Sequence, residues 1–218
     1  MKSIVCDTKS VQAIMQGKMT MFRKVIKPQP KARLCYIGGG DGYSKWAYPY
    51  ETTWIFWGIE YNLPDDLTVE DKKALWTPPF HVDDVLYVKE DFLDIPVMPD
   101  GSFSDKNPYL YYKADGDLRP DGWKDMRWNP SIWMPERLAR LFLQVVEVRV
   151  EQLREITAAD AYASGLGWKG ESTQREVLRR FRTTWDNKFK KADRINYGWD
   201  ANPWVWVVKF ELYEGKGA

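Results

Sequence analysis

Apolar and polar residues alternate along several stretches of the chain with the two-residue period of a β-strand. The clearest stretch lies near the C-terminus, where every second residue from Trp204 to Leu212 is apolar. A wholly apolar face of this kind indicates a strand at residues 204–213 that is central to a core. The same pattern predicts strands at residues 20–26, 84–89, 109–113 and 141–150, with residues 52–57 as a further candidate.

Two short helices are predicted from residues that can cap them. Asp7 can cap one over residues 7–17, and Thr157 another over residues 157–165. A glycine stands at the end of each stretch, as expected where a residue in the left-handed conformation closes a helix.

A longer helix follows the capping box formed by Thr173 and Glu176. Its apolar residues fall on one stripe, which comprises Val177, Leu178, Phe181, Trp185 and Phe189. Its other faces carry the basic residues Arg175, Arg179, Arg180, Arg182, Lys188, Lys190 and Lys191. Such a run is usually a solvated helix face, and a patch that binds nucleic acid is the alternative interpretation.

The order of the elements favours the α+β class. No alternation of strand, helix and strand is present, so we expect a largely antiparallel sheet that forms a closed or half-closed barrel with flanking helices. We find no linker that would divide the chain, which predicts a single domain over residues 1–218. An aromatic-rich insertion occupies residues 31–80, and its glycine run at residues 38–42 is interpreted as a plain loop, because no Gly-Lys-Ser/Thr follows it.

Composition narrows the chemistry. The formal net charge is +1, from 32 basic and 31 acidic residues, so any surface that attracts nucleic acid must be local. The sequence has one histidine, His81, and two cysteines. These counts exclude three-histidine metal sites and a disulfide framework, and a histidine triad could be built only on His81. We therefore expect neither a metal nor a cofactor. The chain has no apolar run of membrane-spanning length and no signal-peptide pattern, which predicts a cytoplasmic location.

Five segments, in order along the chain, resemble signatures of the ASCH superfamily. The first is Gly-Lys-Met-Thr-Met-Phe-Arg-Lys-Val-Ile-Lys-Pro at residues 17–28, and the last is Tyr-Gly-Trp-Asp-Ala-Asn-Pro-Trp-Val-Trp-Val at residues 197–207. Between them lie residues 83–90, 128–135 and 156–165. The resemblance is greatest to the branch found in bacteriophages and prophages, which would place the protein in the cytoplasm of a bacterial host.

The resemblance implies a PUA-like (ASCH) β-barrel with a cleft beside the first motif. That cleft would hold RNA, another single-stranded nucleic acid or a modified nucleotide. The candidate phosphate contacts are Lys18, Thr20, Arg23, Lys24 and Lys27. Trp128 and Trp133 are candidates for stacking on a base, with packing in the core as the alternative for both.

Some ASCH proteins are amidohydrolases of acylated cytidine and others are nucleases, so the resemblance also raises catalysis. The amidohydrolases use a Lys, a Thr and a Glu, and this sequence has Met19, Phe22 and Ser164 at those places. Neither Met nor Phe exchanges a proton. This departure favours binding over catalysis.

Alternatives to a binding module remain open. If the protein is an enzyme, an amidohydrolase or a ribonuclease, the substitute catalytic residues are Lys18, Thr20 and Glu90. Asp200 is a further acid, although its place in a Gly- and Pro-containing segment indicates a turn residue. A third function is that of a protein-binding anti-defence or host-takeover factor of a phage, with residues 43–57 as the surface that contacts a host protein.

Overall fold

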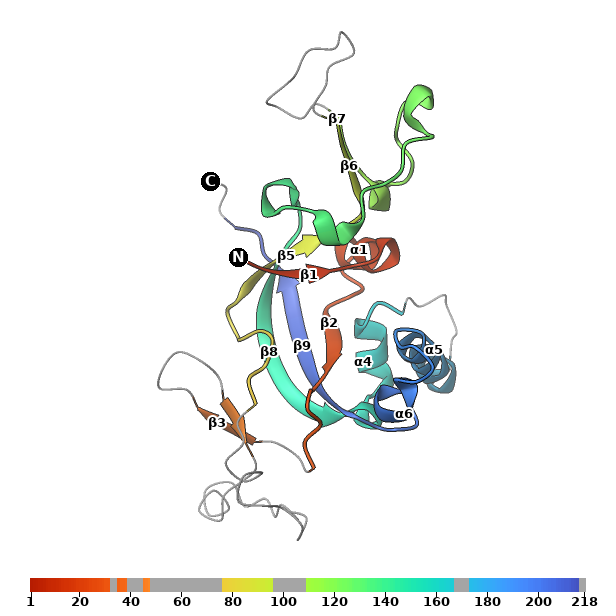
Figure 1. The fold of residues 1–218 in the computed structure, drawn as a ribbon. Helices are drawn as coiled ribbons and strands as arrows, with labels where there is room; N and C mark the ends of the chain where they lie inside the picture. The colour runs from red at the N-terminus through yellow and green to blue at the C-terminus, as the bar shows by residue number, and fades with distance from the viewer. Residues whose placement is uncertain (32–34, 39–44, 48–75, 96–108, 167–172, 216–218) are drawn as a thin grey trace. The chain divides into compact units, whose positions relative to one another are not determined.

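The computed structural model describes residues 1–31, 35–38, 45–47, 76–95, 109–166 and 173–215 (Figure 1). The chain forms two compact units, each built from segments that are distant in the sequence. Unit 1 comprises Met1–Thr20, Asp84–Gln144 and Glu211–Ala218, and unit 2 comprises Met21–Asp83 and Val145–Phe210. Two strands, β8 (Phe142–Gln152) and β9 (Trp204–Leu212), run from one unit into the other.

Unit 1 contains the helix α1 (Thr8–Met15) and two strand pairs. β1 (Lys2–Val5) lies parallel to β5 (Val85–Lys89), and β5 is antiparallel to the first residues of β8. β6 (Phe92–Ile95) and β7 (Tyr109–Tyr112) form an antiparallel hairpin. The 3-10 helices η2 (Lys113–Asp115), η3 (Asp121–Trp123), η4 (Ser131–Trp133) and η5 (Glu136–Leu138) follow it.

Unit 2 is built on the antiparallel pair of β2 (Met21–Val25) and β9. The helices α4 (Ala158–Ala163), α5 (Gln174–Asp186) and α6 (Arg194–Tyr197) lie beside β2 (Figure 1). The 3-10 helix η6 (Leu153–Glu155) links β8 to α4, and β3 (Cys35–Gly38) pairs with β4 (Lys45–Ala47).

The core of unit 2 forms where the apolar stripe of α5 meets the sheet. Val177, Phe181 and Trp185 are buried with Met21 of β2 and with Val205 and Val207 of β9, as the helical spacing predicts. α5 ends at Asp186, one turn earlier than the stripe suggests, yet Phe189 still packs against this core.

The α+β class is confirmed, and most predicted elements are present. The strand order is β1-β5-β8-β9-β2, so β1 and β2 are its two end strands, and the described residues do not close it into a barrel. β1 was not predicted, and its parallel pairing departs from the expected antiparallel sheet. The candidate strand at residues 52–57 lies outside the described residues.

The predicted burial of the last strand is confirmed over most of its length. Trp206, Val208 and Phe210 are buried, whereas Leu212 is 45% exposed. The other side of β9 is also buried at Val205 and Val207, which explains its apolar residues at consecutive positions. Among the described helices, none has the length and apolarity to cross a membrane.

Candidate functional site

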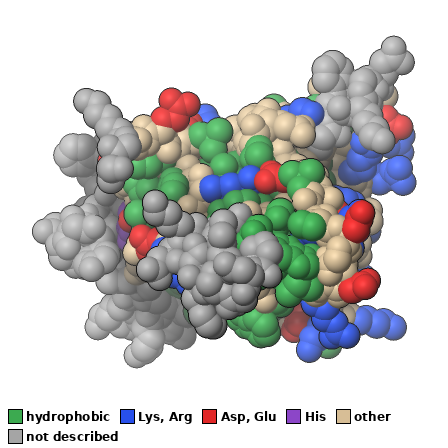
Figure 2. Space-filling view, turned by 90° about the horizontal axis from the view of Figure 1, so that it is seen from above, with side chains coloured by type: hydrophobic (Ala, Val, Ile, Leu, Met, Phe, Trp, Pro, Cys, Tyr) green, Lys and Arg blue, Asp and Glu red, His purple; other side chains and the backbone are tan. Residues whose placement is uncertain are grey.

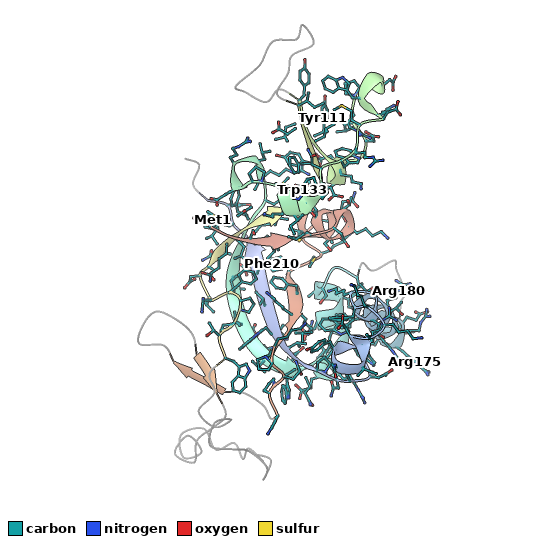
Figure 3. All side chains as sticks on the ribbon, in the orientation of Figure 1. Met1, Tyr111, Trp133, Arg175, Arg180 and Phe210 are labelled. Atoms are coloured by element: carbon teal, nitrogen blue, oxygen red, sulfur yellow. The ribbon has the colours of Figure 1, made fainter. Side chains whose placement is uncertain are left out.

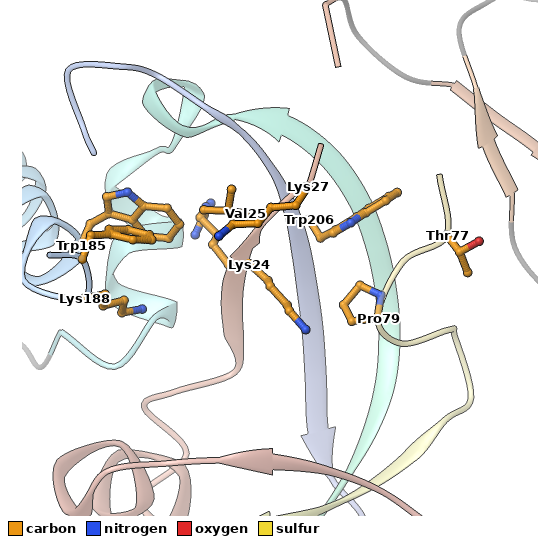
Figure 4. Close-up of a pocket in the computed structure, with 10 residues that line it drawn as sticks. Lys24, Val25, Lys27, Thr77, Pro79, Trp185, Lys188 and Trp206 are labelled. Atoms are coloured by element: carbon orange, nitrogen blue, oxygen red, sulfur yellow. The ribbon is translucent and has the colours of Figure 1, made fainter. Parts of the chain in front are cut away.

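A cavity of about 550 Å³ lies on β2 in unit 2 (Figure 4). It is lined by Arg23, Lys24, Val25, Lys27, Thr77, Pro79, Trp185, Lys188, Phe189 and Trp206. Three of these residues are lysines and three are aromatic, and no aspartate, glutamate or histidine is among them. Its volume is within the range of roughly 300–1,000 Å³ that is usual for small-molecule sites.

The cavity extends across the edge of β2 and is not confined to one face of the sheet. Lys24 lies opposite Trp206 of β9, so the two side chains share a face, while the side chain of Val25 points to the other face. Figure 4 shows Lys24 and Lys27 between Trp185 and Lys188 on one side and Pro79 and Thr77 on the other. Since β2 is an end strand, its outer edge forms part of the cavity wall.

Aromatic rings hold two of the cavity lysines. Lys27 Nζ lies 4.3 Å from the ring centroid of Tyr197, and Lys188 Nζ lies 5.3 Å from that of Trp185. The Trp185 indole is itself fixed, because its Nε1 donates to the Tyr197 carbonyl at 2.8 Å. These contacts keep the two ammonium groups near the cavity.

Arg23 lines the cavity but is committed to buried ion pairs. Its side chain is 1% exposed, and its Nε and Nη2 donate to Glu151 Oε1 at 2.7 Å and to Asp160 Oδ2 at 3.0 Å. Its Nη1 donates to Ser164 Oγ at 3.2 Å. This arrangement gives Arg23 a structural role, and the phosphate contact expected from the sequence stays a prediction.

Arg149 completes the same network. It donates to Asp160 Oδ2 at 2.9 Å, to Glu147 Oε1 at 2.7 Å and to Glu151 Oε2 at 3.3 Å. Burial lowers the pKa of the Arg149 guanidinium, but the Glu147 hydrogen bond and the neighbouring carboxylates outweigh it and raise the pKa overall. Two arginines and three carboxylates therefore form one ion network, whose residues we call the Arg23 network.

The other candidates from the first motif lie outside the cavity lining. Lys18 is exposed in unit 1, and its Nζ donates to Gln16 Oε1 at 2.7 Å. Thr20 is half-buried and is the last residue of the first segment of unit 1. The structure brings together Lys24 and Lys27 from the predicted set, and adds Lys188, which lies just after the end of α5.

The two candidate acids are both paired. Glu90 is buried in unit 1, and its Oε1 and Oε2 accept from Arg140 at 2.8 and 3.0 Å. Burial lowers the pKa of Arg140, but hydrogen bonds to Glu90 and Asp115 outweigh this and raise the pKa overall. Asp200 is exposed and pairs with Arg182 at 2.9 Å.

The two candidate stacking residues belong to unit 1 and differ in exposure. Trp133 is 70% exposed (Figure 3). Trp128 is half-buried beneath the Arg119 guanidinium carbon, which lies 4.3 Å from its ring centroid. Neither residue lines the cavity, where Trp185, Phe189 and Trp206 supply the aromatic surface instead.

The three positions that the resemblance aligns with the catalytic residues of ASCH amidohydrolases are Met19, Phe22 and Ser164. The centroid of the Phe22 ring lies 5.8 Å from that of Phe80, in an edge-on contact, and 6.0 Å from that of Phe210. The Ser164 hydroxyl accepts from Arg23 and donates to the Asp160 carbonyl at 2.9 Å. Met19 is half-buried. Among the described residues, no group of three or more His, Cys, Asp or Glu side chains is placed to hold a metal ion.

Several cavity residues could not be singled out from the sequence. Lys188 is one of seven basic residues on or after the long helix, and nothing in its spacing distinguishes it. Trp206 and Trp185 stand at positions where the sequence pattern predicts core residues, and both are buried.

On the face shown in Figure 2, Lys and Arg side chains lie beside Asp and Glu side chains, in keeping with the neutral composition. The predicted contact surface at residues 43–57 lies almost wholly outside the described residues.

Comparison with known proteins gives little further information. No family model matches the chain, and no curated protein matches it. Among solved structures, an ASCH domain from Lactobacillus crispatus JV V101 is similar over 93% of this chain and 69% of that chain, with 8% sequence identity and a TM-score of 0.35. A similarity at this level establishes neither a common fold nor a common function.

Proposed function

We propose that the protein binds RNA or a nucleotide in the cavity on β2, as an ASCH protein of the phage and prophage branch whose residues 1–218 form one PUA-like domain. The observation that carries the proposal is the lining of the cavity, which has three lysines and three aromatic residues and no acidic residue. The order of the five ASCH-like segments supports it independently.

The charge balance of the chain makes this lining informative. The chain has 32 basic and 31 acidic residues, so carboxylates are available in number to pair with its lysines. Lys24 and Lys27 have no carboxylate partner among the described residues, while Arg23 beside them has two. Unpaired ammonium groups around a concave, partly aromatic surface favour a ligand that carries phosphate and a planar ring.

Catalysis has less support at this site. Hydrolysis of an amide or a phosphodiester needs a group that takes a proton, and carboxylate or imidazole usually supplies it. Within the cavity lining, the side chains that carry exchangeable protons are those of Arg23, Thr77 and the three lysines, apart from the indole groups. The degenerate motif is therefore interpreted as a retained binding site.

The test is the binding of a fluorescent single-stranded RNA at several salt concentrations. We expect the triple variant Lys24→Ala, Lys27→Ala, Lys188→Ala to bind more weakly. Its slope of log affinity against log salt should be smaller by about 2, at about 0.7 for each lost phosphate contact.

A matched triple variant controls for the loss of charge. Lys9, Lys124 and Lys209 are exposed and do not line the cavity, so replacing them with alanine changes the net charge equally. The proposal predicts a near-native slope for this control. Equal affinities and slopes for the cavity variant and the native protein would move the site elsewhere, with the basic face of α5 around Arg175 and Arg180 as the next surface to test (Figure 3).

A further inference from the structure

The hydrogen bonds of β2 determine which of its backbone groups face the cavity. Ile26 N donates to the Trp204 carbonyl at 3.1 Å, so Ile26 and Trp204 stand at a hydrogen-bonded position of the ladder, although the Trp204 N–H donates to Gln29 Oε1 instead. Such positions alternate along an antiparallel ladder, so Lys24 also directs its N–H and C=O toward β9. Arg23 and Val25 then direct theirs away from β9, to the outer edge.

The outer edge is unpaired at Val25. β2 is an end strand, and among the described residues no hydrogen bond involves the Val25 N–H or C=O. Val25 also lines the cavity, between Lys24 and Lys27. The cavity wall therefore combines a fixed backbone donor and acceptor with the three lysines.

We propose that the outer edge of β2 at Val25 hydrogen-bonds to the Watson–Crick edge of a nucleobase, while Lys24, Lys27 and Lys188 hold the phosphate of the same nucleotide. This inference rests on the proposed function and specifies its ligand as a single nucleotide unit. Each of the four unmodified nucleobases presents at least one donor beside an acceptor on this edge, which is the complement of one backbone N–H and C=O.

Charge complementarity decides between this ligand and an added peptide strand. An extended peptide can also pair with the open edge of a sheet. A generic peptide offers no anionic group to Lys24 and Lys27, which have no carboxylate partner among the described residues, whereas a nucleotide offers its phosphate. Phe189, half-buried in the lining, adds an aromatic surface suited to a planar base.

The first test is calorimetry of the native protein with the four ribonucleoside 5′-monophosphates and with ribose 5-phosphate. We expect at least one nucleotide to bind 10-fold or more tightly than ribose 5-phosphate. The same nucleotide with a methyl group on its Watson–Crick edge should lose most of that advantage. This comparison needs no protein variant.

The second test removes one backbone donor. Val25→Pro deletes the outward N–H, and proline is tolerated where the N–H of an edge strand faces away from the sheet. We expect nucleotide binding to fall about 10-fold while ribose 5-phosphate binding is unchanged. Val25→Ala keeps the N–H and controls for the lost side chain.

The outcomes separate this inference from the proposed function. Binding that depends on the lysines but is equal for nucleotides, methylated nucleotides and ribose 5-phosphate overturns the role of the β2 edge alone. Absence of any binding of RNA and nucleotides overturns both. Binding of an extended acidic hexapeptide, sensitive to Val25→Pro and without nucleotide binding, would identify strand addition as the true function.

Discussion

Two regions on either side of β2 differ in whether their basic side chains are paired with carboxylates. Arg23 and Lys24 are adjacent on β2, so their side chains point to opposite faces. Arg23 is buried among carboxylates, whereas Lys24 is exposed in a cavity lining that has none. A basic motif in a sequence can therefore contain one residue that stabilises the fold and a neighbour that is available to a ligand.

The difference follows from the cost of desolvation. A buried arginine must be paired and hydrogen-bonded, because an isolated buried charge is unfavourable by several kcal/mol. The Arg23 network satisfies this requirement with three carboxylates and Arg149. Unit 1 has a similar arrangement, in which Arg140 pairs with the buried Glu90 and with Asp115. Lys24 and Lys27 are exposed to solvent, where an ammonium group without a carboxylate partner is tolerated.

The largest expected effect concerns catalysis, since the cavity lining contains no carboxylate and no imidazole. We expect the native protein to show no measurable hydrolysis of acetylcytidine, because loss of a general base alone lowers a rate by about 10²–10⁴-fold. The measurement is chromatographic detection of cytidine during long incubation. Robust turnover would mean that Lys18, Thr20 and Glu90 act as a displaced catalytic set.

A triple variant provides the converse test. Met19→Lys, Phe22→Thr and Ser164→Glu restore the residues that ASCH amidohydrolases use at these positions. Activity that appears only in this variant would indicate that the cleft has a shape suited to the substrate and lacks only the catalytic side chains. Its stability must be measured in parallel, because Phe22 packs against Phe80 and Phe210.

The second largest effect is on stability. Arg23→Ala should lower the free energy of unfolding by about 3–5 kcal/mol, because Glu151 and Asp160 lose their buried partner and keep only the more exposed Arg149. Lys24→Ala, one residue away, should change it by less than about 0.5 kcal/mol. Urea denaturation of the two variants and the native protein gives both values. Equal stabilities would show that the Arg23 network does not stabilise unit 2.

The third effect is on binding, and it separates two lysines of the first motif. Lys24→Ala should lower RNA affinity and reduce the salt slope by about 0.7, which corresponds to one phosphate contact. Lys18→Ala should leave the slope unchanged, because Lys18 pairs with Gln16 and does not line the cavity. Salt titrations of the two single variants measure this difference. The reverse result would place the nucleic acid on unit 1.

Local signals predicted most elements, while the site depended on contacts between distant residues. The Thr173 capping box and the alternation in residues 204–212 depend on neighbouring positions, and both are present in the structure. The burial of Arg23 depends on Glu151 and Asp160, which are 128 and 137 residues away. The local sequence pattern of residues 17–28 does not reveal ion-pair partners so far along the chain. Arg23 and Lys24 therefore look equivalent in the sequence.

The smallest expected effect concerns the pair of the exposed Asp117 and the buried Arg119, which resembles neither region. Asp117 accepts from Arg119 Nε at 2.7 Å and from Arg119 Nη2 at 2.8 Å, and the Arg119 hydrogen bond lowers the pKa of Asp117 from 3.8 to about 2. A folded-state pKa below the unfolded value contributes stability that is fully present above the unfolded pKa and is lost as the pH falls through the folded one. The window for Asp117 is therefore about pH 4 to 2.

Thermal unfolding of the native protein and of Asp117→Asn from pH 6 to pH 2 tests this prediction. The native protein should unfold at a slightly higher temperature above pH 4, and the difference should disappear as the pH approaches 2. Asp121→Asn, which removes another exposed charge of unit 1, is the matched control and should not reproduce the full change. A difference that stays constant over the whole range would show that Asp117 acts through a neutral hydrogen bond. The Arg119 guanidinium over Trp128 would then be held by packing and by the Met126 carbonyl, without help from the charge of Asp117.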